Sequence, residues 1–262
     1  MSDVTPEILA LVLAVAREAG AIQIARRGEV PSEIEKDGGA TFATAVDVAC
    51  EQVILDALRP RFPEHRFIAE ESGDSGDAGA VYTWAIDPLD GTVNYVSGQP
   101  YFGVSIGLMR YDAPVLGVIH LPAFGTTYWA TRGQGAFRDD MRIHVSAQTQ
   151  LRRSFIGFDM SDLGTRADEL RRLLVPAADS IRFAYVFGSA AANLAFVADG
   201  TLDGYAHTAS IWDFAAGGLL VEEAGGRVTD FDGAPLDWSR RRLDLVATNT
   251  ALHDPFLASI RL

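Results

Sequence analysis

The chain has 262 residues, of which 48% are apolar, enough to build a large core in one compact body or in two lobes that share an interface. Its formal net charge of −13 argues against direct binding to nucleic acids or to acidic membranes, because the average field of the protein would repel both. The single cysteine, Cys50, cannot form an internal disulfide, and we therefore expect a protein of the reducing cytoplasm.

The first predicted element is an amphipathic helix that starts at Thr5-Pro6 and carries apolar residues at helical spacing as far as Ile22. Its apolar run over residues 8–16 is too short to span a bilayer, and the N-terminus lacks the basic segment of a signal peptide. A second helix is predicted over residues 45–58. It begins with Thr44 and Asp47 in the spacing of a capping box.

Two apolar stretches then end in carboxylates. Residues 67–69 lead into Glu70 and Glu71, a pair that by itself is typical of a solvated face. Residues 84–86 lead into Asp87, and Pro88 fixes its own φ and favours an extended conformation for that aspartate. Asp90 follows. Oxygen ligands held in this way suit a hard divalent cation such as Mg²⁺, although a simple turn after a strand would explain the local sequence equally well.

The remaining elements divide into two groups. Residues 101–109, 114–121, 126–131 and 135–137 are short β-rich segments separated by Gly, Pro and Asp turns, which predicts an antiparallel meander, closed by residues 143–146. Strands at 154–158, 202–206 and 243–248 then alternate with helices at 167–174, 189–197, 214–224 and the C-terminus. We predict a boundary near residue 146, with an N-terminal α+β lobe over residues 1–146 and a C-terminal α/β lobe over residues 147–262.

Seven polar residues, considered together with their order and wide spacing along the chain, indicate more than each motif does alone. They are Lys36, Asp47, Glu70, Asp87, Asp90, Thr92 and Asp213. Asp213 precedes a helix of small residues and would ordinarily be a first-turn or capping acid. Together with Gly188-Ser189-Ala190, however, the set resembles the inositol monophosphatase family of Mg²⁺-dependent, lithium-sensitive phosphomonoesterases, within the fructose-1,6-bisphosphatase-like superfamily. The resemblance runs through nearly the whole chain and implies an α+β fold built as a layered αβαβα sandwich.

The resemblance also implies a role for each residue. Glu70, Asp87 and the backbone carbonyl of Leu89 would hold an activating ion. Asp87, Asp90 and Asp213 would hold a second ion, and Glu70 would assist a third, weaker one. Thr92, hydrogen-bonded to Asp47, would orient the attacking water, so that Asp47, Glu70 and Thr92 form the catalytic group. The expected phosphate-binding residues are Lys36, Asp90, Gly91, Thr92, Gly188, Ser189, Ala190 and Asp213.

The cofactor that this set implies is Mg²⁺, with two or three ions per site. Mn²⁺ is the expected substitute, and Li⁺ and Ca²⁺ are the expected inhibitors. In a two-metal mechanism one ion would activate a water and the other would stabilise the leaving oxygen. No covalent phosphoenzyme is expected. A structural calcium module fits less well, since calcium loops draw most of their ligands from one short stretch.

The substrate remains open at this point. In inositol-specific members of the family, a glutamate a short distance before the motif Trp212-Asp213 contacts a sugar hydroxyl. When this chain is aligned to those members, Ala206 occupies the position of that glutamate. The alanine would remove a charge-assisted hydrogen bond worth about 1.5–3 kcal/mol. His207 would either face the substrate end of the site or be a satisfied core residue, and we place no histidine on a metal. Inositol 1-phosphate or a related sugar or polyol phosphate is expected. The alternatives are fructose 1,6-bisphosphate, 3′-phosphoadenosine 5′-phosphate, histidinol phosphate and NADP.

Two further expectations concern partners. Some bacterial members resemble partners of the transcription machinery, so a regulatory interaction protein that keeps the fold is the alternative to an enzyme. The complete set of acids favours the enzyme. A homodimer is expected, because closed two-fold dimers are the commonest soluble assembly.

Overall fold

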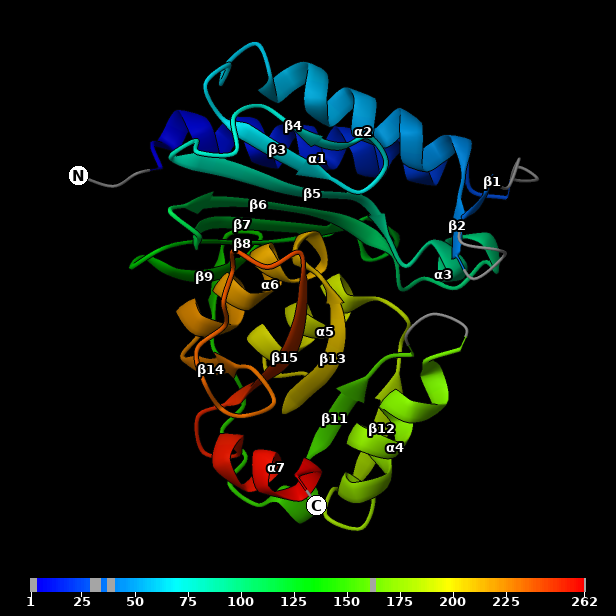
Figure 1. Ribbon diagram of the computed structural model, residues 1–262, viewed down its shortest axis with the longest axis vertical. Helices are drawn as coiled ribbons and strands as arrows, with labels where there is room; N and C mark the ends of the chain where they lie inside the picture. Colours follow the sequence, from blue (N-terminus) through cyan, green and yellow to red (C-terminus); the bar gives the residue numbers. More distant parts are fainter. Residues whose placement is uncertain (1–3, 29–33, 37–40, 161–163, 262) are drawn as a thin grey trace.

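The computed structural model describes residues 4–28, 34–36, 41–160 and 164–261. Helices and sheets alternate in layers (Figure 1). Helices α1 (Pro6–Ala25) and α2 (Ala45–Leu58) cover one face of an eight-stranded sheet, and α5 (Ala190–Ala198) and α6 (Ile211–Glu223) lie between it and a five-stranded sheet. Helices α4 (Arg166–Ala177) and α7 (His253–Ile260) cover the far face of the second sheet. The predicted αβαβα sandwich is confirmed.

The first sheet has the strand order β10-β9-β8-β7-β6-β5-β3-β4 and contains the predicted meander. All its neighbouring strands are antiparallel except β3 and β5. Its strands are β3 (Arg66–Ala69), β4 (Gly73–Ser75), β5 (Tyr82–Asp90), β6 (Gly103–Arg110), β7 (Ala113–Leu121), β8 (Thr126–Thr131), β9 (Gly135–Arg138) and β10 (Met141–Ile143). The register of β5 against β6 shifts between Asp87 and Asp90, so the two carboxylates flank an irregularity at the end of the strand.

The second sheet has the order β12-β11-β13-β15-β14 and is mixed. Its strands are β11 (Phe155–Phe158), β12 (Phe183–Val186), β13 (Gly204–Ser210), β14 (Gly226–Thr229) and β15 (Arg242–Asn249). Strands β12 and β14 form its two edges and were not predicted. The described residues also include a hairpin of β1 (Ile34–Lys36) and β2 (Thr41–Ala43), and the short helix α3 (Thr92–Val96).

Each interface between layers has its own cluster of buried apolar side chains. The cluster between α1, α2 and the first sheet includes Cys50, whose thiol donates to the carbonyl of Ala19 at 3.4 Å. Helix α1 is long and apolar enough to span a membrane by length and composition, but it packs on α2 and strand β7. Its face towards them contains Val12, Ala16 and Ala19, all fully buried.

Small residues let α6 lie unusually close to the first sheet. A Cβ on Gly117 would come within 2.5 Å of the carbonyl oxygen of Ala216, and one on Gly107 within 2.8 Å of the Cβ of Ala215. The hydroxyl of Ser105 in strand β6 donates to the carbonyl of Trp212 at 3.0 Å. These contacts fix the first turn of α6 against the strands of the first sheet. The position of the boundary near residue 146 stays a prediction, and the middle helices contact both sheets.

Candidate active site

Three carboxylates from distant parts of the chain meet at one point. Asp87 and Asp90 come from the end of β5, and Asp213 comes from the first turn of α6. One carboxylate oxygen from each lies within 4.8 Å of the others. Asp87 is 2% exposed and Asp90 is 6% exposed, while Asp213 is half-buried at the edge of a cleft. The structure therefore brings together three of the four predicted carboxylate ligands within the reach of a single ion.

Each carboxylate is held by backbone N–H groups. Asp87 accepts a hydrogen bond from Leu89 N–H at 2.9 Å, and Asp213 accepts one from Ser210 N–H at 2.7 Å within a capping box. Asp90 accepts from the N–H groups of Ala190 and Ala191, at 3.1 and 3.0 Å, at the start of α5.

The hydroxyl of Ser189 also donates to Asp90. The same hydroxyl accepts a hydrogen bond from Ala192 N–H, and so caps α5. The predicted segment 188–190 thus orients Asp90, because Ser189 binds both the carboxylate and the first turn of the helix.

Burial is the main cause of the perturbed pKa values in this cluster, and mutual repulsion adds to it for Asp87 and Asp90. Burial, together with the charges of Glu70, Asp90 and Asp213, raises the pKa of Asp87 well above its usual range. Burial and Asp213 raise the pKa of Asp90 to about 7, and burial raises that of Asp213 to about 6. Carboxylates crowded in this way fit a divalent cation, which would relieve the repulsion and which prefers hard oxygen ligands.

Glu70 lies on the wall of the same cleft. It follows strand β3, is half-buried, and its backbone N–H donates to the carbonyl of Ile86 at 3.1 Å. The adjacent Glu71 has a different environment, since its N–H donates to the carboxylate of buried Glu51 at 2.8 Å. Of the two glutamates, Glu70 therefore belongs to the acidic site.

Thr92 and Asp47 lie as a pair beside the carboxylates. The Thr92 hydroxyl is 3.2 Å from Oδ1 of Asp47 and 3.0 Å from the carbonyl oxygen of Leu89. The other carboxylate oxygen of Asp47 accepts from the N–H and hydroxyl of Thr44, at 2.8 and 2.5 Å. Asp47 therefore caps α2 and also orients Thr92.

Gly91 occupies a position that requires glycine. Its φ is +80°, in the left-handed region, and a Cβ there would come within 2.5 Å of the carbonyl oxygen of Tyr101. The amide of Asn94 donates to the carbonyls of Tyr101 and Phe187, each at 2.7 Å. The contact with Phe187 joins helix α3 to the segment that leads into Gly188.

The cleft beside the carboxylates has a volume of about 600 Å³. Among the predicted site residues it is lined by Glu70, Asp90, Gly188, Ser189, Ala190 and Asp213. Lys36 ends strand β1, and its side chain lies outside what the structure describes. Its expected contact with phosphate stays a prediction.

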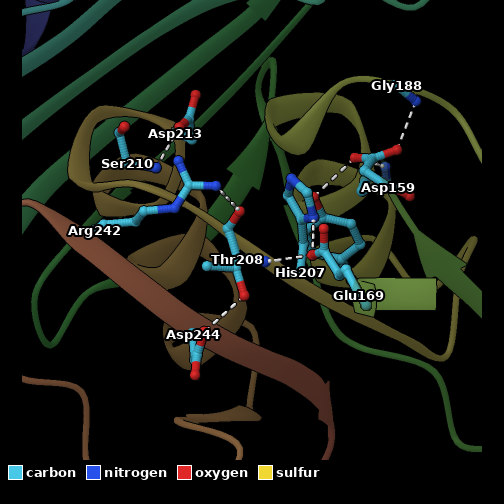
Figure 2. A network of polar contacts seen from close by, with 11 residues as sticks. Asp159, Glu169, Gly188, His207, Thr208, Ser210, Asp213, Arg242 and Asp244 are labelled. Carbon is cyan, nitrogen blue, oxygen red and sulfur yellow. Dashed lines mark hydrogen bonds and ion pairs between the residues drawn. The ribbon is translucent and has the colours of Figure 1, made fainter. Parts of the chain in front are cut away.

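A buried polar network that the sequence did not predict lies on the other side of the cleft (Figure 2). Asp159 accepts hydrogen bonds from Gly188 N–H at 2.6 Å, from the Asn193 amide at 3.0 Å and from the Tyr205 hydroxyl at 2.8 Å. A signal was available, because Asp159 follows the apolar strand β11 just as Asp87 follows an apolar stretch of β5. Beside it, Nδ1 of His207 lies 2.7 Å from Oε1 of Glu169.

The expectation that Ala206 stands where inositol-specific members have a glutamate stays a prediction. The side chain of Ala206 is fully buried in the cluster between the second sheet and helices α4 and α7. The next residue, His207, lines the cleft instead. Successive side chains of a strand point to opposite faces, so Ala206 and His207 lie on different faces of β13.

Comparison with known proteins agrees with the fold. The chain matches the inositol monophosphatase family over residues 6–261. It is 36% identical to inositol monophosphatase 2 of Solanum lycopersicum, over 97% of this chain and 98% of the relative. It is 38% identical to the Nus factor SuhB of Salmonella typhimurium, over 86% of each chain.

A solved structure of the extragenic suppressor protein suhB from Bartonella henselae superimposes with a TM-score of 0.90 at 32% identity. The superposition covers 97% of this chain and 98% of that one. Both the sequence and the fold match over almost the full length. The chain belongs to the inositol monophosphatase family.

Proposed function

We propose that this phosphatase hydrolyses a small-molecule phosphate monoester with Mg²⁺, and that inositol 1-phosphate or a related sugar or polyol phosphate is the substrate. The observation that carries the proposal is the meeting of Asp87, Asp90 and Asp213 within 4.8 Å, beside a cleft that Asp90 and Asp213 line and that is large enough for such an ester. Burial raises the pKa of all three carboxyl groups, so ionising them inside the folded chain costs free energy. A divalent ion would offset that cost.

In this proposal Glu70, Asp87 and the Leu89 carbonyl hold one ion, and Asp87, Asp90 and Asp213 hold the second. Glu70 assists a third. The bound ions would lower the pKa of a water and stabilise negative charge on the leaving oxygen. Mn²⁺ would substitute for Mg²⁺, and Li⁺ and Ca²⁺ would inhibit.

The chain's own groups orient the reactants. The Thr92 hydroxyl is fixed by the carboxylate of Asp47, and it would hold the attacking water in line with the phosphorus. The backbone N–H groups of Gly91 and Thr92, at the start of α3, would receive the phosphate, as would the segment 188–190 on the cleft wall. Lys36 would add a positive charge at the same place.

Phosphate release tests this proposal directly. We would measure it with and without Mg²⁺ for wild type and Asp90→Asn, over inositol 1-phosphate, fructose 1,6-bisphosphate, 3′-phosphoadenosine 5′-phosphate, histidinol phosphate and NADP. The exposed Asp168 of α4 provides a matched control as Asp168→Asn. We expect phosphate release to require Mg²⁺, to survive in the control variant, and to fall by orders of magnitude in Asp90→Asn. Full activity of Asp90→Asn would contradict the ligand assignment.

A regulatory role is the second candidate function, favoured by the relative named Nus factor SuhB. The net charge of −13 disfavours direct contact with nucleic acid, so the partner would be a protein of the transcription machinery. A pull-down with transcription factors, in which wild type and Asp90→Asn bind equally, would support it. Binding by neither protein would exclude it.

We further propose a cytoplasmic homodimer. The edge strand β12 exposes Phe183 and Val186, and Phe155 on the neighbouring strand is also exposed. A second copy of the chain would cover these apolar side chains. Light scattering of the purified protein would show twice the mass of one chain, and a monomer at micromolar concentration would contradict the proposal.

A further inference from the structure

Basic groups line the same cleft as the carboxylates. They are Arg166 at the start of α4, His207 on β13 and Arg242 on β15. Strands β13 and β15 are antiparallel, and Arg242 pairs with Ser210, three residues after His207. The pairing of these two strands therefore brings an imidazole and a guanidinium to the wall of the cleft near Asp213 (Figure 2).

The contacts of His207 define what its ring can offer. The ring is 8% exposed, and its Nδ1 lies 2.7 Å from Oε1 of Glu169, which is also buried. Because an ionised carboxylate only accepts, Nδ1 must carry the proton of this hydrogen bond. Nε2 has no hydrogen-bond partner among the described residues. The ring lines the cleft, so Nε2 is the atom left for a ligand.

The surroundings of His207 favour its charged form. Burial opposes a positive charge on the ring, but the hydrogen bond to Glu169 and the charge of Asp159 raise the pKa of His207 above its usual value. A protonated ring has a second N–H, at Nε2, and that group can only donate. Glu169 is itself fixed by Thr208 N–H at 2.9 Å, so the imidazole is held in one orientation.

Arg242 adds a second donor group. Its Nη2 lies 3.4 Å from the carbonyl oxygen of Thr208, and the Thr208 hydroxyl donates to Asp244 at 2.6 Å. A guanidinium carries five N–H donors in a planar fork, which lets it contact a carbonyl and an anion at the same time. Arg242, and His207 in its protonated form, are donors without acceptor capacity, and an acceptor-only anion matches them better than a neutral hydroxyl.

We propose that the cleft binds a second anionic group of the substrate, either a second phosphate or a carboxylate, through His207 and Arg242. This inference rests on the proposed phosphatase function and, among the substrates proposed there, favours sugar or polyol esters with a charged leaving group over inositol 1-phosphate, whose leaving group is neutral. The phosphate that is hydrolysed lies at the carboxylate site, and the second anion lies on the β13–β15 side of the same cleft.

Matched substrate pairs test the inference. Fructose 1,6-bisphosphate and fructose 1-phosphate differ by one phosphate, and 3-phosphoglycerate and glycerol 3-phosphate differ by a carboxylate. In at least one pair the wild type should prefer the more anionic ester about tenfold or more in kcat/KM, chiefly through KM. The pair that shows the preference identifies the anion as a phosphate or a carboxylate.

The variants are Arg242→Gln and His207→Gln, with Arg242→Lys to keep the charge and Arg171→Gln as an exposed control on α4. Both glutamine variants should reduce the preference about tenfold, whereas Arg242→Lys and Arg171→Gln should keep most of it. Mg²⁺-dependent release without a preference in either pair, or a preference that both glutamine variants retain, would overturn the inference and leave the phosphatase function standing.

A binding measurement separates the two proposals. Fructose 6-phosphate carries only the second phosphate of the bisphosphate, and calorimetric titration in EDTA measures its affinity without metal or turnover. If the second anion is a phosphate, wild type and Arg171→Gln should bind it about tenfold more tightly than Arg242→Gln. The same titration with glycerate tests the carboxylate. Such binding in a protein that releases no phosphate from any ester would support the anion site and contradict the phosphatase function.

Discussion

The clearest prediction concerns the stability of the metal-free protein. Burial and Asp213 raise the pKa of Asp90 from the ordinary 3.8 to about 7, so at pH 5 to 7 the folded chain holds a proton that the unfolded chain has lost. Where the folded state binds more protons, the free energy of unfolding falls as pH rises. The stabilisation is fully present below the pKa of Asp90 in the unfolded chain. It is lost as the pH rises through the pKa of Asp90 in the folded chain.

The size of the effect follows from these two values. Between pH 5 and pH 8 the wild type should lose about 3 kcal/mol of stability through Asp90, at about 1.4 kcal/mol per unit of pKa. Asp90→Asn has no such group, and its loss over the same range should be smaller by that amount. The free energies of unfolding of the two proteins also differ by an amount that does not depend on pH, because asparagine changes the hydrogen bonds with Ser189 and α5. The pH dependence of the difference is therefore the quantity that tests the reasoning.

Urea denaturation in EDTA at pH 5, 6, 7 and 8 measures this difference. Asp168→Asn is the control, because that carboxylate is 84% exposed and should leave the pH profile unchanged. Mg²⁺ should abolish the fall in wild-type stability, because the ion replaces the protons that the cluster holds. A difference between wild type and Asp90→Asn that stays constant from pH 5 to pH 8 would refute the argument.

Three other predictions follow from single contacts. Thr92→Val should lower kcat about 100-fold while the protein stays folded, and Thr92→Ser should keep most of the activity, because the hydroxyl is the group that orients the water; equal rates for the two variants would contradict this role. Gly91→Ala should destabilise the fold by about 2 kcal/mol more than Gly98→Ala in urea titrations, since both glycines have positive φ but only at Gly91 does a Cβ meet the carbonyl of Tyr101. Ala206→Glu should lower the free energy of unfolding by about 3 kcal/mol or more, because it buries a carboxylate between the second sheet and α4; a stable protein with an improved rate on inositol 1-phosphate would contradict this argument.

Elements with local signals at their ends were predictable from the sequence. Helix α2 has the predicted bounds, because Thr44 and Asp47 mark its start and the apolar pattern ends at Leu58. The meander was predicted from its turns. Strand β12 was missed because it is four residues long and exists by pairing with β11 at a sheet edge, which no local pattern reveals.

The candidate site shows the same limit. Asp87, Asp90 and Asp213 stand in motifs whose order resembles a known family, and the structure brings them together. The network around Asp159 depends on contacts with Asn193 and Tyr205, over sequence separations of 34 and 46 residues, and no spacing rule predicts them.

The way in which Asp90 is held has a consequence for how this enzyme can be divided or recombined. Asp90 ends a strand of the first sheet and receives the first N–H groups of α5, which packs between the two sheets. Its partner carboxylate, Asp213, comes from the other half of the chain. A fragment of residues 1–146 would keep two acids but lose the third and the helix that orients Asp90. A chimaera of two relatives joined near residue 146 would therefore be active only if α5 of one parent places its first N–H groups against Asp90 of the other as in this structure.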